Sequence, residues 1–459
     1  MTNTEERRER ELFGTDGVRG QANVHPMTAE VALKLGQAVA HVFLEAGSDR
    51  RHQILIGKDT RLSGYMFEDA LASGICSMGV DVIHVGPVPT PALAFLTSDM
   101  RCDAGVMITA SHNPYQDNGI KFFGRDGYKL PDEIELQIEE LISSGRLSEF
   151  RASADALGKA SRIDDVEGRY VVFLKNSFPR GVTLDGMRIV LDCANGSAYK
   201  VGPTVLRELG AEVICLGVEP DGRNINAECG SLYPEQAAAI VREVGADVGI
   251  TVDGDADRVL LIDEHGEILD GDRVIALCAQ QLRQRGELRG GGVVATVMSN
   301  LGLEEHLAEQ GLDLIRTQVG DRYVVEAMRA GGYNLGGEPS GHVILLDRST
   351  TGDGMMTALQ VLAVMAQEQK SLSQLLPGFR QYPQVMLNIG ISRRRPLEEL
   401  NGFQEAVRKV ETKLGPGGRV LIRYSGTELK ARVMVEGKDE SLVKDSAEHL
   451  ASALKVALE

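Results

Sequence analysis

The sequence predicts an α/β protein: three related mixed-sheet α/β domains in series and a smaller C-terminal α+β domain, arranged around a central cleft. Three observations predict this fold class. With 459 residues, the chain is long enough for about three or four domains. A pattern of strand, helix, glycine and strand occurs three times along it. After residue 382 the pattern changes to an alternating strand, a charged helix, a strand pair and a last helix, which is typical of an α+β domain.

The repeated unit is a short β-branched strand, a polar loop, an amphipathic helix that ends at glycine, and a second strand. Its copies span residues 53–86, 187–217 and 293–316. Strands that alternate with helices of this length indicate βαβ units, which place ligand sites at the carboxyl ends of their strands. The unit is also common among unrelated proteins, so the repeat supports the fold class whether or not the three domains are related.

Polar stretches mark the candidate domain boundaries. They lie at residues 143–159, in the Asp-rich turn Asp253–Arg258, and at residues 367–374. From these positions we expect α/β domains over residues 1–155, 156–254 and 255–370, and an α+β domain over residues 371–459.

Composition and charge exclude several classes of partner. The formal net charge is −17, so a nucleic acid or an anionic membrane would be repelled. The six cysteines form no CxxC pair, and we expect them to be reduced and structural. The charged N-terminus has no apolar signal region, and no run of about eighteen apolar residues occurs. We therefore expect a cytoplasmic protein that captures anionic ligands locally, through arginines or a cation.

Ser111 is a candidate nucleophile because of its place in the chain. The apolar strand Ala104–Ile108 runs directly into the loop Thr109–Pro114, and Pro114 prevents a simple helical continuation. Ser111 should therefore lie on a turn at the carboxyl end of a strand, where its hydroxyl can be exposed. Taken alone, a serine in such a turn is more often a turn former than a nucleophile.

Three carboxylates follow the apolar strand at residues 248–252, namely Asp253, Asp255 and Asp257. Carboxylates at every second position around a glycine can converge on one hard divalent cation, and Arg258 can neutralise phosphate oxygens beside it. Magnesium suits this set if a phosphate supplies a further oxygen. A calcium-binding EF-hand is excluded, because Arg258 stands where that loop needs glycine and Val259–Ile262 resembles a strand. A solvated acidic turn is the remaining alternative.

Four further segments carry chemical groups. Lys121 lies among apolar neighbours, where a desolvated lysine can act as general acid or base, although a snorkelling lysine is the commoner explanation. The loop Glu338–His342 offers a carboxylate and a hydroxyl for sugar hydroxyls, or a tight structural turn. The segment Arg423–Glu428, with Arg432, fits a phosphate clamp. The glycine-rich loop Phe13–Gly20 adds Arg19 but is not a Walker A motif.

Four of these motifs together resemble the α-D-phosphohexomutase superfamily. They are a TASHNP serine loop at residues 109–114, a DGDxDR metal loop at 253–258, a GExSGH sugar loop at 337–342 and an SGTE phosphate loop at 425–428. The match covers nearly the whole chain, and four ordered motifs are far more specific than one. Within the superfamily, the stretches that resemble the phosphoglucosamine mutases are residues 13–20, 221–226, 298–303, 319–324 and 351–354.

The resemblance implies a mutase that interconverts glucosamine 6-phosphate and glucosamine 1-phosphate and so supplies UDP-N-acetylglucosamine for cell-wall synthesis. It implies a phosphoserine at Ser111, a hexosamine or hexose 1,6-bisphosphate as primer, a small phosphosugar as substrate and a homodimer. The residues implied to hold Mg²⁺ are Ser111, Asp253, Asp255 and Asp257. Proton transfer and charge neutralisation would involve Lys121, His342, His112, Arg19 and Arg258. Sugar hydroxyls and the non-reacting phosphate would be bound by Glu338, Ser340, Arg423, Ser425, Gly426, Thr427 and Arg432.

Two residues depart from the pattern of that group. Pro339 stands where phosphoglucosamine mutases commonly carry Gln, and Ala256 stands where Gly is common. Pro339 keeps a phosphomannomutase or phosphoglucomutase of the same superfamily as the nearest alternative. Two other classes are a phosphatase with Asp253 as phospho-acceptor, because Asp-x-Asp also suits haloacid-dehalogenase chemistry, and a non-catalytic phosphosugar-binding protein. The phosphatase hypothesis leaves the serine loop and the SGTE segment without a role.

Overall fold

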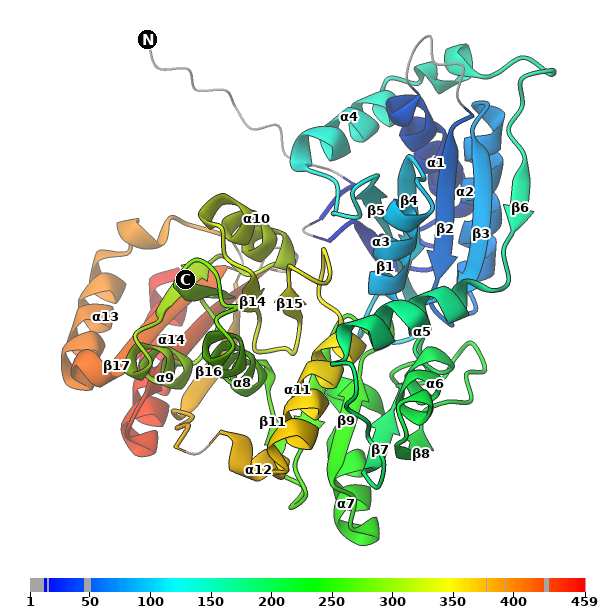
Figure 1. Cartoon of the computed structure of the whole chain (residues 1–459). Helices are drawn as coiled ribbons and strands as arrows, with labels where there is room; N and C mark the ends of the chain where they lie inside the picture. The colour runs from blue at the N-terminus through cyan, green and yellow to red at the C-terminus, as the bar shows by residue number, and fades with distance from the viewer. Residues whose placement is uncertain are drawn as a thin grey trace.

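The protein folds into four units that follow one another along the chain (Figure 1). The computed structural model describes residues 12–14, 16–44, 51–376, 378–391, 393–424 and 429–458. Three units are mixed α/β layers and the fourth is a smaller α+β unit, which confirms the predicted fold class. Within these ranges, no helix combines the length and the apolar character needed to cross a membrane.

The first unit is a six-stranded sheet in the order β1-β5-β4-β2-β3-β6, in which β5 runs antiparallel to both neighbours. Ile54 and Ile56 pack with helices α1 and α2, while Leu55 between them packs with α3 on the opposite face, as the alternation of a buried strand requires. The strands are β1 (Val18–Gln21), β2 (Gln53–Lys58), β3 (Asp81–Pro87), β4 (Ala104–Ile108), β5 (Asp117–Gly124) and β6 (Ala160–Arg162). The helices are α1 (Ala29–Phe43), α2 (Gly64–Ser77), α3 (Thr90–Asp99), α4 (Asp132–Ser143) and the 3-10 helix η1 (Arg146–Phe150).

The second unit is a five-stranded sheet in the order β11-β10-β9-β7-β8. The predicted boundary at residue 254 falls inside this sheet, because β10 and β11 follow that residue and pair antiparallel with β9 and with each other. We therefore propose that this unit extends to Leu269. Its strands are β7 (Arg188–Asp192), β8 (Glu212–Leu216), β9 (Val248–Val252), β10 (Val259–Ile262) and β11 (Ile268–Leu269). Its helices are α5 (Val166–Ser177), α6 (Val201–Glu208), α7 (Glu235–Val244) and the 3-10 helix η2 (Gly230–Leu232).

The third unit is a four-stranded sheet in the order β13-β12-β14-β15, with β15 antiparallel to β14. The turn between β14 and β15 carries the predicted sugar loop. The strands are β12 (Gly292–Thr296), β13 (Asp313–Thr317), β14 (Leu335–Gly337) and β15 (Val343–Leu345). The helices are α8 (Gly271–Gln284), α9 (Leu301–Glu309), α10 (Asp321–Gly331), α11 (Gly354–Glu368) and α12 (Leu372–Leu375).

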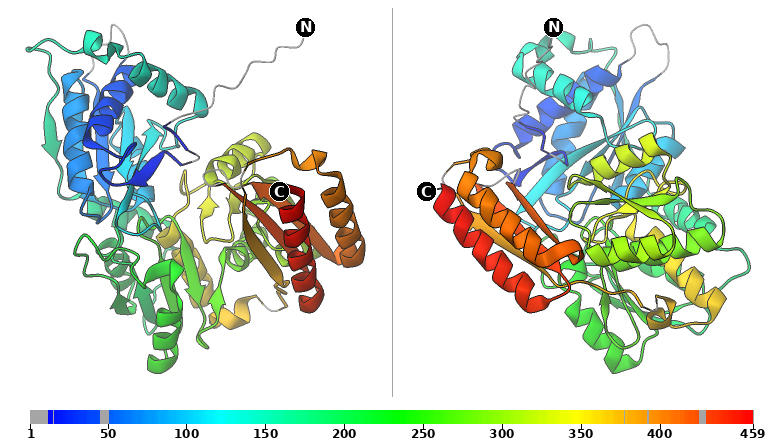
Figure 2. Two further views of the ribbon diagram at one scale, coloured as in Figure 1. Left: turned by 180° about the vertical axis from the view of Figure 1, so that it is seen from behind. Right: turned by 90° about the vertical axis from the view of Figure 1, so that its left-hand side faces the viewer.

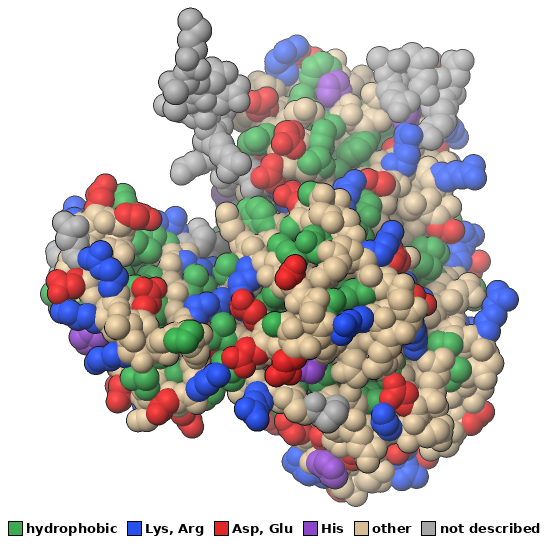
Figure 3. All heavy atoms as spheres, turned by 60° about the vertical axis from the view of Figure 1, so that its left-hand side comes forward, with side chains coloured by type: hydrophobic (Ala, Val, Ile, Leu, Met, Phe, Trp, Pro, Cys, Tyr) green, Lys and Arg blue, Asp and Glu red, His purple; other side chains and the backbone are tan. Residues whose placement is uncertain are grey.

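The fourth unit is a three-stranded antiparallel sheet in the order β16-β18-β17, with two long helices side by side on one face (Figure 2). In the space-filling view it forms a lobe at the left, and the surface is hollowed between this lobe and the first unit (Figure 3). Its elements are β16 (Gln384–Gly390), η3 (Leu397–Glu399), α13 (Asn401–Leu414), η4 (Gly415–Gly417), β17 (Gly418–Tyr424), β18 (Lys430–Gly437) and α14 (Glu440–Leu458).

The three predicted repeats are βαβ units in the structure. The strand pairs β2/β3, β7/β8 and β12/β13 are each parallel, and each pair is joined by one helix. A continuous hydrophobic core then joins the first three units, with Leu96 of α3, Tyr170 of α5 and Leu359 of α11 among its members. The fourth unit has a separate core, so its attachment to the third unit depends on other contacts.

Polar contacts attach the fourth unit to the third. Arg419 donates from its two Nη atoms to the main-chain carbonyls of Val297 and Ser299 (2.9 Å each). Asn300 and Tyr382 exchange two hydrogen bonds, of 3.0 and 2.9 Å. The polar segment at residues 367–374, predicted as a domain boundary, forms the end of α11 and most of α12. Its side chains accept hydrogen bonds from residues at the C-terminal end of α8, so it belongs to the third unit. The connection to the fourth unit therefore follows α12.

Candidate active site

The serine loop presents Ser111 to the metal loop of the second unit. Ser111 has φ +51°, a left-handed conformation that costs a non-glycine residue about 1–2 kcal/mol. Its main-chain N–H donates to Thr109 Oγ1 (2.9 Å), and its Oγ donates to Asp253 Oδ2 (2.6 Å). Ser111 is 1% exposed. The hydroxyl is therefore directed into the junction between the first two units.

Arg61, a residue that sequence analysis did not single out, fixes this loop. Its side chain is fully buried, and all five of its N–H groups have acceptors. Nε donates to Asp59 Oδ2 (2.8 Å), and the Nη atoms donate to the main-chain carbonyls of Ser111 (2.9 Å), Asn113 (2.8 Å), Asp117 (3.1 Å) and Pro114. From the second unit, Asn226 Nδ2 donates to two of the same carbonyls, those of Ser111 (2.9 Å) and Asn113 (3.0 Å). The first and the second unit therefore both hold the strained Ser111 in place.

The metal loop brings its three carboxylates together in the turn between β9 and β10. The side chains of Asp253, Asp255 and Asp257 are buried, and their ligand oxygens all lie within 4.8 Å of one another. Burial, then Asp257 and Asp255, raise the pKa of Asp253 well above its usual value. Asp255 Oδ1 and Asp257 Oδ1 have no hydrogen-bond partner within the part of the chain that the structure describes. Such a set fits a divalent cation, which would relieve the repulsion.

The residues flanking these carboxylates complete the loop. Ala256 adopts φ +57°, the left-handed conformation for which glycine is the usual choice, so the departure at this position adds strain. The main-chain N–H of Arg258 donates to Asp253 Oδ1 (3.2 Å), and its Nε lies 3.8 Å from Asp257 Oδ1. From the first unit, Thr90 Oγ1 donates to Asp255 Oδ2 (2.6 Å). The loop is therefore held from both sides.

Lys121 lies among carboxylates from two units. Its Nζ is 3.0 Å from Asp255 Oδ2, 3.2 Å from Asp16 Oδ2 and 3.7 Å from Asp257 Oδ2. Burial lowers the pKa of Lys121, but these three carboxylates outweigh it and hold the pKa well above its usual range. The side chain is therefore a cation in this arrangement.

Asp16, Lys129 and Asp321 join this cluster, although sequence analysis gave them no role. Asp16 forms ion pairs with Arg19, Lys121 and Lys129. Lys129 Nζ also lies 2.5 Å from Asp321 Oδ2. Asp16 and Asp321 fall within stretches that carried the family resemblance, but Lys129 gave no signal in the sequence. Only the fold brings them together.

Two histidines flank the cluster. His112 Nδ1 lies 3.3 Å from Ser111 Oγ, and burial, Arg258 and Arg19 lower the pKa of His112 to about 4. His342 Nδ1 lies 3.6 Å from Asp257 Oδ1, and its Nε2 lies 3.5 Å from Asp321 Oδ2. Burial lowers the pKa of His342, but Asp257 and then Asp321 outweigh it and raise the pKa. Gly352 N–H nonetheless donates to Nε2 (3.1 Å), which fits the neutral ring with its proton on Nδ1.

The sugar loop forms the turn between β14 and β15. Glu338 Oε1 accepts from the main-chain N–H of Gly320 (3.0 Å), and its Oε2 accepts from Ser340 Oγ (3.3 Å). Glu338 interacts electrostatically with Arg258 of the second unit and Arg423 of the fourth. The carboxylate therefore faces the metal loop and the predicted phosphate clamp.

Two arginines pair across the sheet of the fourth unit. Arg423 and Arg432 are direct cross-strand neighbours on β17 and β18. Burial, and then the nearby Arg432, lower the pKa of Arg423. Arg432 Nε is buried without a hydrogen-bond partner within the described ranges. Two like charges in this arrangement favour an anion between them. The other predicted clamp residues, Ser425, Gly426 and Thr427, lie outside the described residues.

Models of one enzyme family match all four units. They are described as phosphoglucomutase/phosphomannomutase alpha/beta/alpha domains I, II and III, at residues 10–149, 169–266 and 270–382, and the C-terminal domain, at residues 386–453. The chain belongs to this family and is a mutase of the isomerase class. The superfamily predicted from the four motifs is thereby confirmed.

Individual relatives give a narrower comparison. The chain is 57% identical to phosphoglucosamine mutase of Syntrophotalea carbinolica and 56% identical to that of Myxococcus xanthus, with 97% of each chain covered in both comparisons. A phosphoglucomutase/phosphomannomutase family protein of Burkholderia thailandensis has the same fold, with a TM-score of 0.79 at 24% identity over 97% of both chains. N-acetylphosphoglucosamine mutase of Aspergillus fumigatus, solved with GlcNAc-6P and magnesium, gives a TM-score of 0.67 at 20% identity over 98% of this chain and 96% of the other.

Proposed function

We propose that the chain is a phosphoglucosamine mutase, which interconverts glucosamine 6-phosphate and glucosamine 1-phosphate through a phosphoserine at Ser111 and a 1,6-bisphosphate intermediate. The observation that carries the proposal is the 2.6 Å hydrogen bond from Ser111 Oγ to Asp253 Oδ2. A serine hydroxyl directed at a carboxylate cluster, with Lys121 and Arg258 beside it, suits a phosphoryl carrier better than a turn former. The names of relatives that match over nearly the full length support the hexosamine substrate.

Mg²⁺ is the metal that we propose for the carboxylate cluster. Asp253, Asp255 and Asp257 would hold it with an oxygen of the phosphoserine, and the buried Oδ1 atoms of Asp255 and Asp257, which have no hydrogen-bond partner within the described ranges, support this assignment. When bound, the ion neutralises charge on the oxygens of a transferring phosphoryl group. A hexosamine or hexose 1,6-bisphosphate is the proposed primer.

The transfer itself requires two proton movements. The bond from phosphorus to Ser111 Oγ breaks while a bond from phosphorus to a sugar hydroxyl oxygen forms; the hydroxyl loses its proton and Ser111 Oγ gains one. Lys121, protonated among its carboxylates, is the proposed donor. His342 is the proposed acceptor, and its Nε2 takes the hydroxyl proton once it releases the Gly352 N–H. In the return step the other phosphate of the bisphosphate is transferred to Ser111, and the two roles reverse.

The remaining predicted residues bind and screen charge. His112 is uncharged at neutral pH, so it can hydrogen-bond beside Ser111 Oγ without adding charge, whereas Arg19 and Arg258 supply the positive charge. Glu338 and Ser340 would bind sugar hydroxyls. Arg423 and Arg432, with Ser425, Gly426 and Thr427, would bind the phosphate that is not reacting.

A separate core would let the fourth unit open while the bisphosphate turns and close again to exclude water. This movement follows from the proposed intermediate, which must expose its second phosphate to Ser111. A cytoplasmic location and a homodimer stay predictions.

The test is a Mg²⁺-dependent assay of wild type and Ser111→Ala on glucosamine 6-phosphate, with a hexose 1,6-bisphosphate as primer and intact-mass measurement of both proteins. We expect glucosamine 1-phosphate and a phosphate-sized mass increment with wild type only. Turnover of glucose or mannose phosphates instead would favour a phosphoglucomutase or phosphomannomutase and would direct attention to Pro339. Net release of phosphate, or full activity of Ser111→Ala, would contradict the mutase mechanism.

A further inference from the structure

Six side chains from three units form a closed ring beside the metal loop, in which three carboxylates alternate with the two ammonium groups and the His342 imidazole. Each member contacts the next, so that the position of one constrains the others. The contacts in order are Lys121 to Asp16 (3.2 Å), Asp16 to Lys129, Lys129 to Asp321 (2.5 Å), Asp321 to His342 (3.5 Å), His342 to Asp257 (3.6 Å) and Asp257 to Lys121 (3.7 Å).

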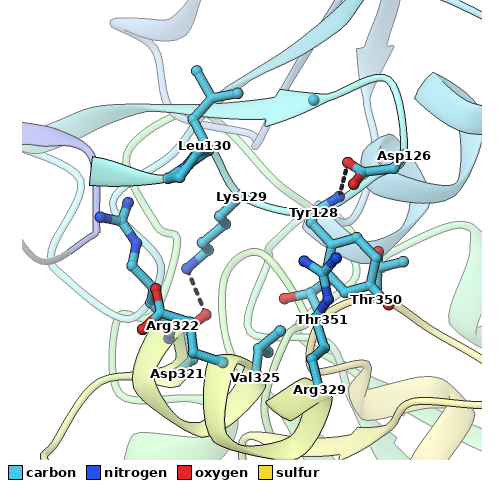
Figure 4. A pocket seen from close by; sticks show the side chains of 13 residues that line it. Asp126, Tyr128, Lys129, Leu130, Asp321, Arg322, Val325, Arg329, Thr350 and Thr351 are labelled. Atoms are coloured by element: carbon cyan, nitrogen blue, oxygen red, sulfur yellow. Dashed lines mark hydrogen bonds and ion pairs between the residues drawn. The ribbon is translucent and has the colours of Figure 1, made fainter. Parts of the chain in front are cut away.

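Asp16, Lys129 and Asp321 are the members of the ring without a proposed role, and Lys129 and Asp321 form the contact between the first and third units. Lys129 follows β5 of the first unit, and Asp321 is the first residue of α10 in the third. Their side chains are 11% and 12% exposed. The pair lines a cavity of about 270 Å³, where the ammonium of Lys129 points at the carboxylate of Asp321 across the two units (Figure 4). The pair therefore joins the first unit to the third directly beside the site.

Lys129 acts on Lys121 through Asp16, whereas Asp321 contacts His342 directly. Lys129 binds Asp16 Oδ1, whose other oxygen contacts Lys121 Nζ. Asp321 lies beside Nε2 of His342. The main chain of Gly352 packs closely against the same imidazole, since a Cβ added at Gly352 would lie 2.5 Å from imidazole atoms. Loss of Lys129 removes a cation that holds Asp16 beside Lys121, and loss of Asp321 removes a contact of His342 itself.

We propose that Lys129 and Asp321 are positioning residues for the mutase reaction, acting as a pair that fixes Lys121 and His342 with respect to Ser111. The inference rests on the proposed function, because those two groups transfer protons only in that mechanism. A displacement of about 1 Å in a reacting geometry can cost about 100-fold in rate. Among the described residues, the pair contacts none of those assigned to sugar or phosphate binding, so its loss should lower kcat and leave KM close to the wild-type value.

Arg322, the next residue of α10, supplies a matched control. It also joins the third unit to the first, through ion pairs with Asp132 and with Glu135 (2.7 Å to Glu135 Oε1), and it lines the same cavity. Its main-chain N–H donates to Asp321 Oδ1 (2.9 Å), a bond that a substitution of the side chain keeps, while the hydrogen bonds and ion pairs of its guanidinium within the described ranges go to Asp132 and Glu135 and to no member of the ring. Arg322→Met therefore weakens the attachment of the two units without opening the ring.

The experiment measures kcat and KM of the full chain with Mg²⁺ and glucosamine 6-phosphate, for wild type, Lys129→Met, Asp321→Asn, the double variant, Asp321→Glu and Arg322→Met. We expect kcat to fall about 100-fold in each single ring variant. The double variant should be no slower than the singles, because either change opens the ring, and Asp321→Glu should recover much of the rate. Urea unfolding and the intact mass of each variant establish that it is folded and report whether Ser111 carries phosphate.

Three results would overturn the proposal. The first is a kcat near the wild-type value in both single variants, and the second is a double variant in which the two losses of kcat multiply. The third is a loss of kcat in Arg322→Met equal to that in Lys129→Met, which would indicate that the rate depends on the attachment of the two units and not on the ring. If wild type turns over only glucose or mannose phosphates, the proposed substrate fails, and the same comparison is made with that sugar. A wild type inactive on all three sugars overturns the function and the inference together.

Discussion

Replacing Arg61 by methionine should lower the free energy of unfolding, because it leaves the carboxylate of Asp59 without its buried cation. The three carbonyls of the loop keep other donors, since Asn226 bonds those of Ser111 and Asn113 and the N–H of Asp117 bonds that of Pro114. The main loss is the cation beside Asp59, whose side chain is fully buried. Removing one partner of a buried ion pair typically costs about 3–5 kcal/mol. Because Asp59 keeps bonds from Thr109 Oγ1 and the main-chain N–H of residue 61, we expect about 3 kcal/mol.

The sign of the pH dependence follows from the same pair. Burial raises the pKa of Asp59, and Arg61 lowers it, so the pKa rises further in Arg61→Met. A folded-state pKa above the unfolded value makes stability fall as pH rises through it. The loss should therefore be larger at pH 8 than at pH 5.

Urea unfolding of the full chain at both pH values tests this reasoning. The matched control is the double variant Asp59→Asn/Arg61→Met, which has no charge at these two buried positions. It should recover part of the stability at pH 8, and its stability should lose the dependence on pH that Arg61→Met shows. A loss below about 1 kcal/mol for Arg61→Met, or a double variant less stable than the single one, would refute the argument from the buried charge.

Three further perturbations have definite expectations. Burial and then Asp270 raise the pKa of Asp272 to about 7, so Asp272→Asn should remove a fall in wild-type stability between about pH 4 and pH 7, measured as urea midpoints across that range. Asp253→Asn should abolish Mg²⁺-dependent turnover yet raise the melting temperature of metal-free protein, because one of three repelling carboxylates is gone; Mg²⁺ should raise the melting temperature of wild type only. Arg432→Met should raise KM for the phosphosugar without loss of stability, since it also relieves the repulsion between Arg432 and Arg423. Steady-state kinetics and urea unfolding test this, and an unchanged KM or a lower urea midpoint would contradict it.

Sequence analysis predicted the groups whose neighbours lie close along the chain. Asp253, Asp255 and Asp257 stand at alternate positions of one turn, so they remain close together in any fold that contains the turn. Ser111 follows a buried strand directly, and a turn at that point brings the side chain to the edge of a sheet. The assignment of catalytic roles to these residues is still a proposal.

Contacts between distant segments could not be predicted in this way. Lys129 meets Asp16 across 113 residues and Asp321 across 192, and no local pattern at Lys129 distinguishes it from a surface lysine. The Asp-rich turn gave a misleading signal for the boundary at residue 254, because a polar loop inside a sheet and a linker between units have the same composition. Pairing of β10 with β9 distinguishes the two.

The sequence by itself determined the fold class, the three βαβ repeats, the family and the cluster of three carboxylates that we propose for the metal, because periodicity, turn chemistry and the spacing of short motifs are properties of neighbouring residues. Tertiary structure decided which charges face one another and how deeply they are buried. The pKa of Lys121 is raised because carboxylates outweigh the effect of burial and favour its charged form, whereas the pKa of Asp253 is raised because burial, and then neighbouring carboxylates, disfavour its charged form. Electrostatic energies in a protein interior depend on distance and burial, and both are set only when the four units come together.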